Sequence, residues 1–156
     1  MEREQRNQGG RNTGELWLVG AGPGDAELLT RKAARLLAEA DVLVHDHRIN
    51  ADILALAAGA ERIDAGKDEG AGGGEGLAGA DLHALLVRRV RAGQKVVRLL
   101  EGDPFIFGGG AELEAARLAG ISCHVVPGIS AALGCASEAG LPLTHQALAS
   151  AVSFVS

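Results

Sequence analysis

The chain has 156 residues, enough for one domain with a substantial hydrophobic core. Its net charge of -5, its scattered basic residues and its low aromatic content of 3% argue against nucleic acid as a partner and favour a small molecule. No apolar run approaches the roughly 18 residues of a membrane span, and the first residues lack the apolar stretch of a signal peptide, so we expect a soluble, cytoplasmic protein. The two cysteines, Cys123 and Cys135, form no CxxC pair, and we expect reduced, buried thiols.

Strand and helix patterns alternate along the chain, after a polar leader at residues 1–14 that we expect to be disordered. Short buried apolar runs predict the strands, and apolar residues at helical spacing predict the helices. The expected strands are 15–19, 42–45, 62–65, 96–100 and 122–126, and the expected helices are 26–40, 50–58, 81–92, 111–118 and 130–138. This alternation predicts an α/β fold, a mostly parallel five-stranded sheet with helices on both faces, in one domain over residues 15–139.

The end of the chain departs from this alternation. Residues 140–144 are typical of a linker, and Ala151–Val155 has the pattern of a new strand whose partners are not in the sequence. We therefore expect residues 140–156 to form a linker and the first strand of a second domain that is largely absent.

The fourth predicted strand ends in a tight, Gly- and Pro-containing turn at Gly102–Phe105. An open α/β sheet binds its ligand at the carboxyl ends of its strands, where backbone groups leave the ladder and face a small molecule. Phe105, Ile106 and Phe107 follow, and they either form a wall of such a pocket or pack under the next helix.

A second glycine turn, Gly20–Asp25 (GAGPGD), follows the first strand and invites a dinucleotide-binding interpretation. Its glycine spacing differs from that motif, and the carboxylates of Asp25 and Glu27 would repel a phosphate. A cationic ligand without phosphate fits this turn better. S-adenosylmethionine, with its sulfonium and ammonium groups, is such a ligand, and Asp103 in the central turn would add to the favourable field.

Five motifs together resemble the tetrapyrrole methylase family, and within it the uroporphyrinogen-III C-methyltransferases. They are LWLVGAGPGDAELLT, ADVLVHD, the GK pair at 66–67, VVRLxxGDPFIFG and VVPGISAALGCASEAGLPLTHQALAS. They occur in the family's order and cover roughly residues 15–156, which makes the resemblance specific.

The resemblance implies a two-domain enzyme, usually a homodimer, that binds S-adenosylmethionine in a cleft and releases S-adenosylhomocysteine. It implies methylation of two pyrrole carbons of uroporphyrinogen III to give precorrin-2, on the way to sirohaem or cobalamin. The family's proton acceptor falls on Asp46 and its proton donor on Lys67. Its cofactor contacts fall on Pro23, Glu101, Gly102, Asp103, Ile106, Ser130 and Ala131.

The residues alone leave several of these roles open. Asp46 ends a buried strand and is placed either to accept a ring proton or to cap the following helix. Lys67 either pairs with substrate carboxylates or is solvated. Arg48 and Arg98 are candidate anchors for anionic groups, although Arg98 in a strand serves equally well in a structural ion pair. The His45-Asp46-His47 triplet lacks a third ligand, so we expect no metal.

The chain also departs from the family pattern. Leu100, Glu101 and Gly109 stand where the family has lysine, glycine and arginine, and Asp68 replaces an arginine. A Gly-rich tract at residues 70–80 replaces a segment that carries histidine and glutamine. These changes remove positive charge and add negative charge, and they favour weaker binding of an anionic substrate.

Two other functions fit parts of the same pattern. A relative in the superfamily would methylate corrin intermediates, or ribosomal RNA, which the acidic composition disfavours. A non-catalytic or cofactor-binding-only fragment would fold, and would either bind the methyl donor without turnover or not bind it tightly. Titration with S-adenosylhomocysteine discriminates between a competent half-site and a fragment that does not bind.

Overall fold

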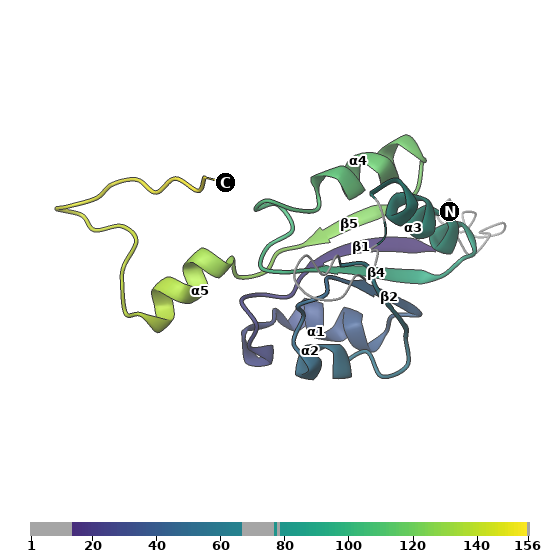
Figure 1. Cartoon of the computed structure of the whole chain (residues 1–156), viewed down its shortest axis with the longest axis horizontal. Coiled ribbons are helices and arrows are strands. Elements are labelled where there is room, and N and C mark those ends of the chain that lie inside the picture. The colour runs from purple at the N-terminus through teal and green to yellow at the C-terminus, as the bar shows by residue number, and fades with distance from the viewer. Residues whose placement is uncertain (1–13, 67–76, 78, 156) are drawn as a thin grey trace, which may run out of the picture.

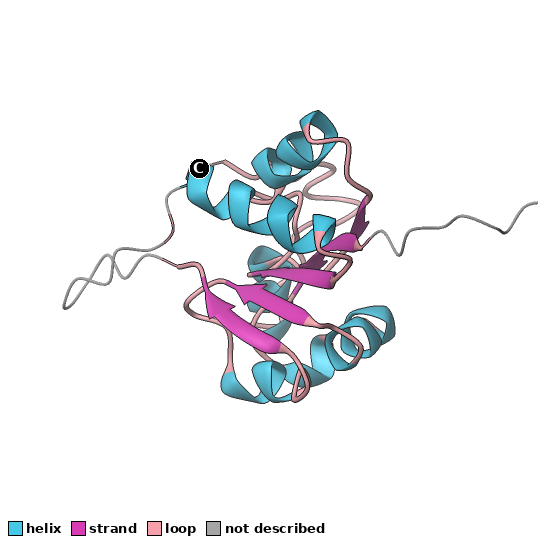
Figure 2. Cartoon of the chain, turned by 90° about the vertical axis from the view of Figure 1, so that its right-hand side faces the viewer, coloured by secondary structure: helices cyan, strands magenta, loops and turns pink. Residues whose placement is uncertain are grey.

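The computed structural model describes residues 14–66, 77 and 79–155. Five parallel strands form one sheet in the order β3-β2-β4-β1-β5, with helices on both faces (Figures 1 and 2), which confirms the predicted fold class. The strands are β1 (Glu15–Gly20), β2 (Val42–His45), β3 (Glu61–Asp64), β4 (Lys95–Leu100) and β5 (Cys123–Val126). Lys67, the Gly-rich tract up to residue 76 and the leader up to residue 13 lie outside the described residues.

Each face of the sheet is covered by its own helices (Figure 1). On one face lie α1 (Arg31–Ala38) and α2 (Ala51–Ala55), and on the other α3 (Gly79–Arg91) and α4 (Gly110–Leu118). The strands in the middle of the sheet read as continuous apolar runs because alternate side chains enter two different cores. The core under α1 and α2 contains Val19, Leu36, Leu43, Ile53 and Val97, and the core under α3 and α4 contains Leu16, Leu18, Val44, Leu86 and Val96.

The predicted helix over 26–40 forms as two pieces. A 3-10 turn, η1 (Ala26–Leu28), precedes α1, and each piece has its own cap. The Asp25 carboxylate accepts a hydrogen bond from the Glu27 N–H at 2.8 Å, and the Thr30 hydroxyl accepts one from the Ala33 N–H at 3.1 Å. Thr30 therefore begins a new helix inside a pattern that apolar spacing alone reads as continuous.

The last helix, α5 (Ala131–Glu138), lies away from the sheet, and the chain after it runs outward and then turns back (Figure 1). Gly134 is the one buried residue of α5, all of which the structure describes. Residues Ala151–Val155, predicted to be the first strand of a second domain, adopt neither helix nor strand in this structure. A strand needs a neighbour for its backbone hydrogen bonds, and none of the described strands lies beside this segment.

The cysteine prediction holds only in part. Both thiols are free, but Cys123 is half-buried and Cys135 on α5 is exposed. Burial raises the pKa of the Cys123 thiol to about 11, so this thiol stays protonated at neutral pH.

No helix within the described residues is long and apolar enough to cross a bilayer.

Candidate functional site

Three turns meet at the carboxyl edge of the sheet, where β1, β4 and β5 end. Beyond the strands, Gly22 and Gly102 exchange two backbone hydrogen bonds, of 3.1 and 3.0 Å. Both glycines have φ values in the left-handed region, 71° and 62°, which a residue with a side chain rarely adopts. These hydrogen bonds therefore join the turn after β1 (Gly20–Asp25, the first turn) to the turn after β4 (Gly102–Phe105, the central turn).

The turn after β5, which we call the third turn, lies directly against the other two. A Cβ atom at Gly128 would collide with the Gly102 carbonyl oxygen and with the backbone of Gly20. The Asp103 carboxylate fixes this contact, because Oδ2 accepts a hydrogen bond from the Gly128 N–H at 3.0 Å and Oδ1 accepts one from the Phe105 N–H at 2.8 Å. Asp103 thus uses both oxygens to tie the central turn together and to hold it against the third turn.

Most of the predicted cofactor contacts meet at this junction. A Cβ atom at Gly102 would lie 3.5 Å from the Ala131 nitrogen and 3.6 Å from the Ser130 Cα. Gly134 on α5 is in such close contact with the Pro23 ring that a side chain there would not fit. Pro23, Gly102, Asp103, Ser130 and Ala131 therefore come together from three turns that are distant in sequence.

A cavity of about 510 Å³ opens between the first turn and α5. Its two ionisable carboxylates belong to Asp25 and Glu138, and no lysine or arginine is found among the described residues that line it. The remaining lining is Pro23, Leu28, Gly134, Cys135 and Ala139. This partly apolar, negatively charged wall is suited to a ligand that combines an apolar body with positive charge.

Asp46, the predicted proton acceptor, lies at the end of β2 and contacts the neighbouring strand β4. Its Oδ1 accepts a hydrogen bond from Arg98 Nη2 at 2.6 Å, and its Oδ2 accepts one from the Glu101 N–H at 3.0 Å. It does not cap the following helix, because the Asn50 side chain does so by accepting a hydrogen bond from the Asp52 N–H at 3.0 Å. The Asp46 carboxylate is therefore held in place by β4 and the turn that follows it.

Arg98 is the buried centre of this arrangement, with 5% of its surface exposed. Besides Asp46, its guanidinium faces the Glu112 carboxylate of α4 at 3.5 Å, and Nη1 donates a hydrogen bond to the Leu99 carbonyl at 3.0 Å. The structural ion pair considered for Arg98 thus exists. Glu112 was not predicted from the sequence. It could have been found as an acidic residue on the core-facing side of a helix, because the strand before that helix contains a buried arginine that needs a partner.

Two adjoining cavities, of about 450 and 400 Å³, flank Asp46. Both are lined by Asp46, Leu100, Phe107 and Gly108. The first also contains Arg98 and Glu112 and the start of α4, and the second contains Arg48, Gly66, Glu101 and Ile106. The predicted contacts Glu101 and Ile106 thus lie on the Asp46 side and do not line the cavity beside Pro23. Gly66, which also lines the second cavity, is the last described residue before the Gly-rich tract.

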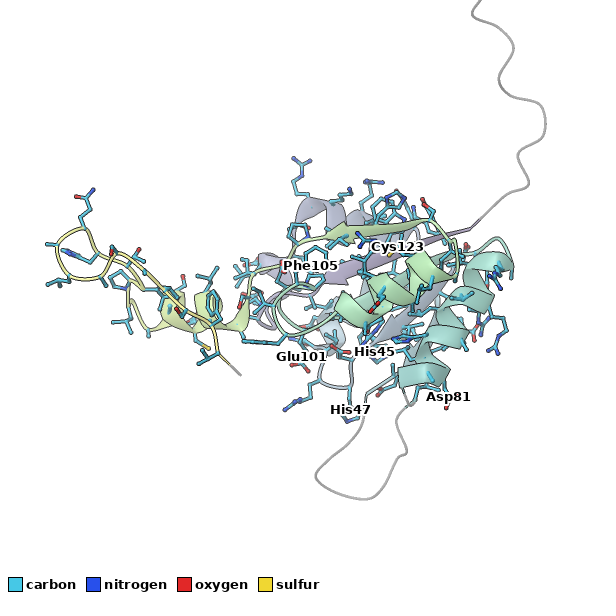
Figure 3. The ribbon with its side chains drawn as sticks, turned by 90° about the horizontal axis from the view of Figure 1, so that it is seen from above. His45, His47, Asp81, Glu101, Phe105 and Cys123 are labelled. Carbon is cyan, nitrogen blue, oxygen red and sulfur yellow. The ribbon has the colours of Figure 1, made fainter. Side chains whose placement is uncertain are left out.

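The charged groups around the second cavity are already paired with one another. Arg48 Nε lies 3.5 Å from the Glu101 carboxylate, and His47 Nδ1 lies 2.7 Å from that of Asp64. Glu101, His45 and His47 are on the same side of the molecule (Figure 3). Partial burial opposes ionisation of Asp64, but hydrogen bonds from His47 and from the Gly66 N–H outweigh it, so the pKa of Asp64 lies below its ordinary value.

The His45-Asp46-His47 triplet shows no metal-binding geometry. His45 Nδ1 contacts the Asp46 carbonyl oxygen at 2.8 Å, and His47 turns to Asp64. Within the described residues, no group of three or more His, Cys, Asp or Glu side chains is arranged to hold a metal ion.

Residues 15–155 match the model of a protein family described as tetrapyrrole (corrin/porphyrin) methylases. Among curated proteins, the chain is 53% identical over 144 residues to a siroheme synthase of Methylococcus capsulatus, covering 91% of this chain and 30% of that protein. It is 49% identical over 144 residues to a siroheme synthase of Acinetobacter baylyi, covering 91% and 31%. The chain thus spans about 30% of the length of these relatives.

Solved structures of similar fold extend this comparison. A crystal structure of uroporphyrin-III C-methyltransferase from Thermus thermophilus matches with a TM-score of 0.76 and 41% identity, covering 86% of this chain and 56% of that one. A structure of the enzyme from the same organism complexed with S-adenosylhomocysteine matches with a TM-score of 0.72 and 44% identity, covering 86% and 55%. A cobalt precorrin-4 methyltransferase matches with a TM-score of 0.70 and 31% identity, covering 86% and 54%.

Proposed function

Because the chain belongs to the tetrapyrrole (corrin/porphyrin) methylases, we propose that it forms the methyl-donor-binding part of an S-adenosylmethionine-dependent C-methyltransferase. The proposed substrate is uroporphyrinogen III, and the products are precorrin-2 and S-adenosylhomocysteine. The observation that carries this proposal is the meeting of three turns at one edge of the sheet, which unites Pro23, Asp103 and Ser130.

The residues at this edge fit a cationic methyl donor. The cavity beside Pro23 has the carboxylates of Asp25 and Glu138 in its lining and apolar surface from Leu28 and Ala139. Gly20 and Gly128 pack so tightly on the Gly102 carbonyl oxygen that neither has room for a side chain, which leaves backbone groups at the surface of this junction. The residues proposed to hold the donor are Pro23, Gly102, Asp103, Ser130 and Ala131, whereas Glu101 and Ile106, also expected to contact it, line the cavity on the Asp46 side.

The bound donor supplies a methyl group on a positively charged sulfur, and the chain supplies position, electrostatics and proton transfer. Asp46, held by Arg98 and the Glu101 N–H, presents its carboxylate at the wall of both neighbouring cavities. There it accepts the proton that the tetrapyrrole loses elsewhere on the ring system when a fully substituted pyrrole carbon is methylated, which balances the positive charge lost from the sulfur. Lys67, the proposed proton donor, assists the shift of ring protons that accompanies this loss. No covalent intermediate with the enzyme is required.

The proposal includes a homodimer in the cytoplasm. The exposed apolar side chains Leu133 on α5 and Leu141 after it support association, since a second copy would remove them from water. Light scattering of the purified chain tests this part: a mass of two chains supports it, and a mass of one chain at micromolar concentration contradicts it.

Calorimetric titration with S-adenosylhomocysteine tests the donor site. We expect saturable binding at micromolar concentration, and weaker binding in the Asp25→Asn and Glu138→Gln variants, because each removes a lining carboxylate. Asp81→Asn is the matched control, since Asp81 lies in the first turn of α3, far from α5, and does not line this cavity (Figure 3). The absence of binding heat would favour a folded fragment without a donor site.

A further inference from the structure

Phe107 combines two unfavourable features that its own packing does not explain. Its φ value is 60°, and it is the one non-glycine residue with a positive φ in the described part of the chain. Its ring is also 67% exposed, so the phenyl group gains little from burial. A bulky residue in the left-handed region is strained, and such strain is concentrated at sites that bind or react.

The loop around Phe107 holds this backbone conformation in place. On its N-terminal side, the Asp103 carboxylate accepts a hydrogen bond from the Phe105 N–H at 2.8 Å, and the Asp103 carbonyl oxygen accepts one from the Ile106 N–H at 3.1 Å. On its C-terminal side, Gly109 packs so closely on the Pro104 carbonyl oxygen that a Cβ atom there would collide with it. The chain on both sides is therefore fixed, and the direction of the Phe107 side chain is set by the loop.

The position of the ring indicates what the strain achieves. Phe107 lines both cavities that flank Asp46, and the other residues that the two cavities share are Asp46, Leu100 and Gly108. An exposed phenyl group at the junction of two cavities, next to a fixed carboxylate, offers a flat apolar face to a ring that enters either cavity. Aromatic rings favour offset stacked or edge-to-face contact with such a face.

We propose that Phe107 is a binding residue for the substrate, and that its ring stacks against a pyrrole ring and places that ring beside Asp46. This inference rests on the proposed function, because it takes a tetrapyrrole as the ligand of the two cavities. It adds that the left-handed conformation at Phe107 serves to hold the ring out of the core, where the ligand reaches it.

The test replaces Phe107 and follows binding and stability separately, with uroporphyrin III as the probe in about 0.15 M salt, where exposed charges are screened beyond about 8 Å. Phe107→Gly removes the ring and suits the positive φ. We expect its thermal midpoint to equal or exceed that of the unsubstituted chain, while its affinity for uroporphyrin III falls about tenfold. Phe107→Leu should lose a similar factor, and Phe107→Tyr should retain the affinity.

Phe105→Ala is the matched control, because Phe105 is also exposed, at 57%, and belongs to the same loop but lines neither cavity. We expect its affinity for uroporphyrin III to be unchanged. The inference is overturned if Phe107→Gly keeps the affinity for uroporphyrin III, lowers the thermal midpoint, or changes only the oligomeric state. It is also overturned if the unsubstituted chain does not bind uroporphyrin III. S-adenosylhomocysteine binding should be the same in all variants, so loss of that binding in the unsubstituted chain signals failure of the donor site instead.

Discussion

Arg98 fixes the carboxylate that the proposed chemistry requires. It brings a positive charge into the centre of the sheet, where it is 5% exposed, and it is neutralised by Asp46, directly after β2, and by Glu112 from α4. A buried charge without partners is strongly unfavourable, so each of the three residues depends on the other two. This mutual dependence joins the stability of the sheet to the geometry of the site.

The Arg98→Leu variant leaves two carboxylates near the core without their partner. We expect the free energy of unfolding to fall by about 3 kcal/mol, as measured by denaturant titration. Arg35→Leu removes an arginine that pairs with Glu39 on the exposed surface of α1, at 3.3 Å, and should change stability by less than about 1 kcal/mol. Equal effects of the two variants would contradict a special role for Arg98.

Glu101 neutralises the arginine best placed to meet an anionic substrate. Its carboxylate lies 3.5 Å from Arg48 at the second cavity, where both side chains are exposed. In the Glu101→Gln variant, Arg48 is released and a negative charge is lost, so we expect the affinity for uroporphyrin III to rise about threefold and to become more sensitive to salt.

Two variants check this prediction for Glu101. Arg48→Gln combined with Glu101→Gln should cancel the gain, because the released cation is then absent. Glu114→Gln removes an exposed carboxylate of α4 that lines neither cavity beside Asp46, and should leave the affinity unchanged. A gain of equal size in Glu114→Gln would assign the effect to net charge rather than to Arg48.

At the scale of elements, apolar periodicity located the five strands of the sheet to within about one residue, but it does not show where a hydrogen bond divides a helix or whether a strand has a neighbour to pair with. Thr30 divides the predicted helix 26–40 because its hydroxyl caps the Ala33 N–H. Ala151–Val155 has the residues of a strand but no described strand beside it. Residue patterns predict local preference, whereas the presence of a pairing partner depends on the rest of the fold.

The division at Thr30 has a measurable consequence. Thr30→Ala leaves the Ala33 N–H without its side-chain partner, and we expect a loss of about 1 kcal/mol in the free energy of unfolding. Thr30→Ser keeps the hydroxyl and should lose much less. Thr144→Ala, in the exposed chain after α5, should have no effect, and a loss of stability there as large as in Thr30→Ala would indicate a general effect of threonine removal.

The sequence predicted which turns form the candidate site, but it did not predict which side chains contact one another there. The glycine and proline patterns after the first and fourth strands indicated ligand-binding turns, since their position at the carboxyl ends follows from strand order. The pairing of Asp46 with Arg98 crosses 52 residues and depends on the adjacency of β2 and β4, which local patterns do not specify. The conformation of Phe107 is set by the loop around it and has no signature in residue type.

For the whole molecule, the arrangement joins two half-sites at one edge of the sheet. The junction of Pro23, Asp103 and Ser130 lies on one side of the turn after β4, and the cavities beside Asp46 lie on the other. The turn after β4 contributes to both, because Gly102 contacts the third turn while the Glu101 N–H binds Asp46. A methyl donor and an acceptor ring bound at these two places would approach each other across this turn.

The central claim is that the three turns form one site for the methyl donor. Backbone amide NMR spectra of the chain, recorded with and without S-adenosylhomocysteine, test it residue by residue. We expect the largest shifts at Gly22 and Gly24, at the non-proline residues of 102–106, and at 128–131, and little change at the amino-terminal ends of the strands, such as Leu16 and Val96. Shifts confined to only one of the three turns, or located on another face of the molecule, would contradict the claim.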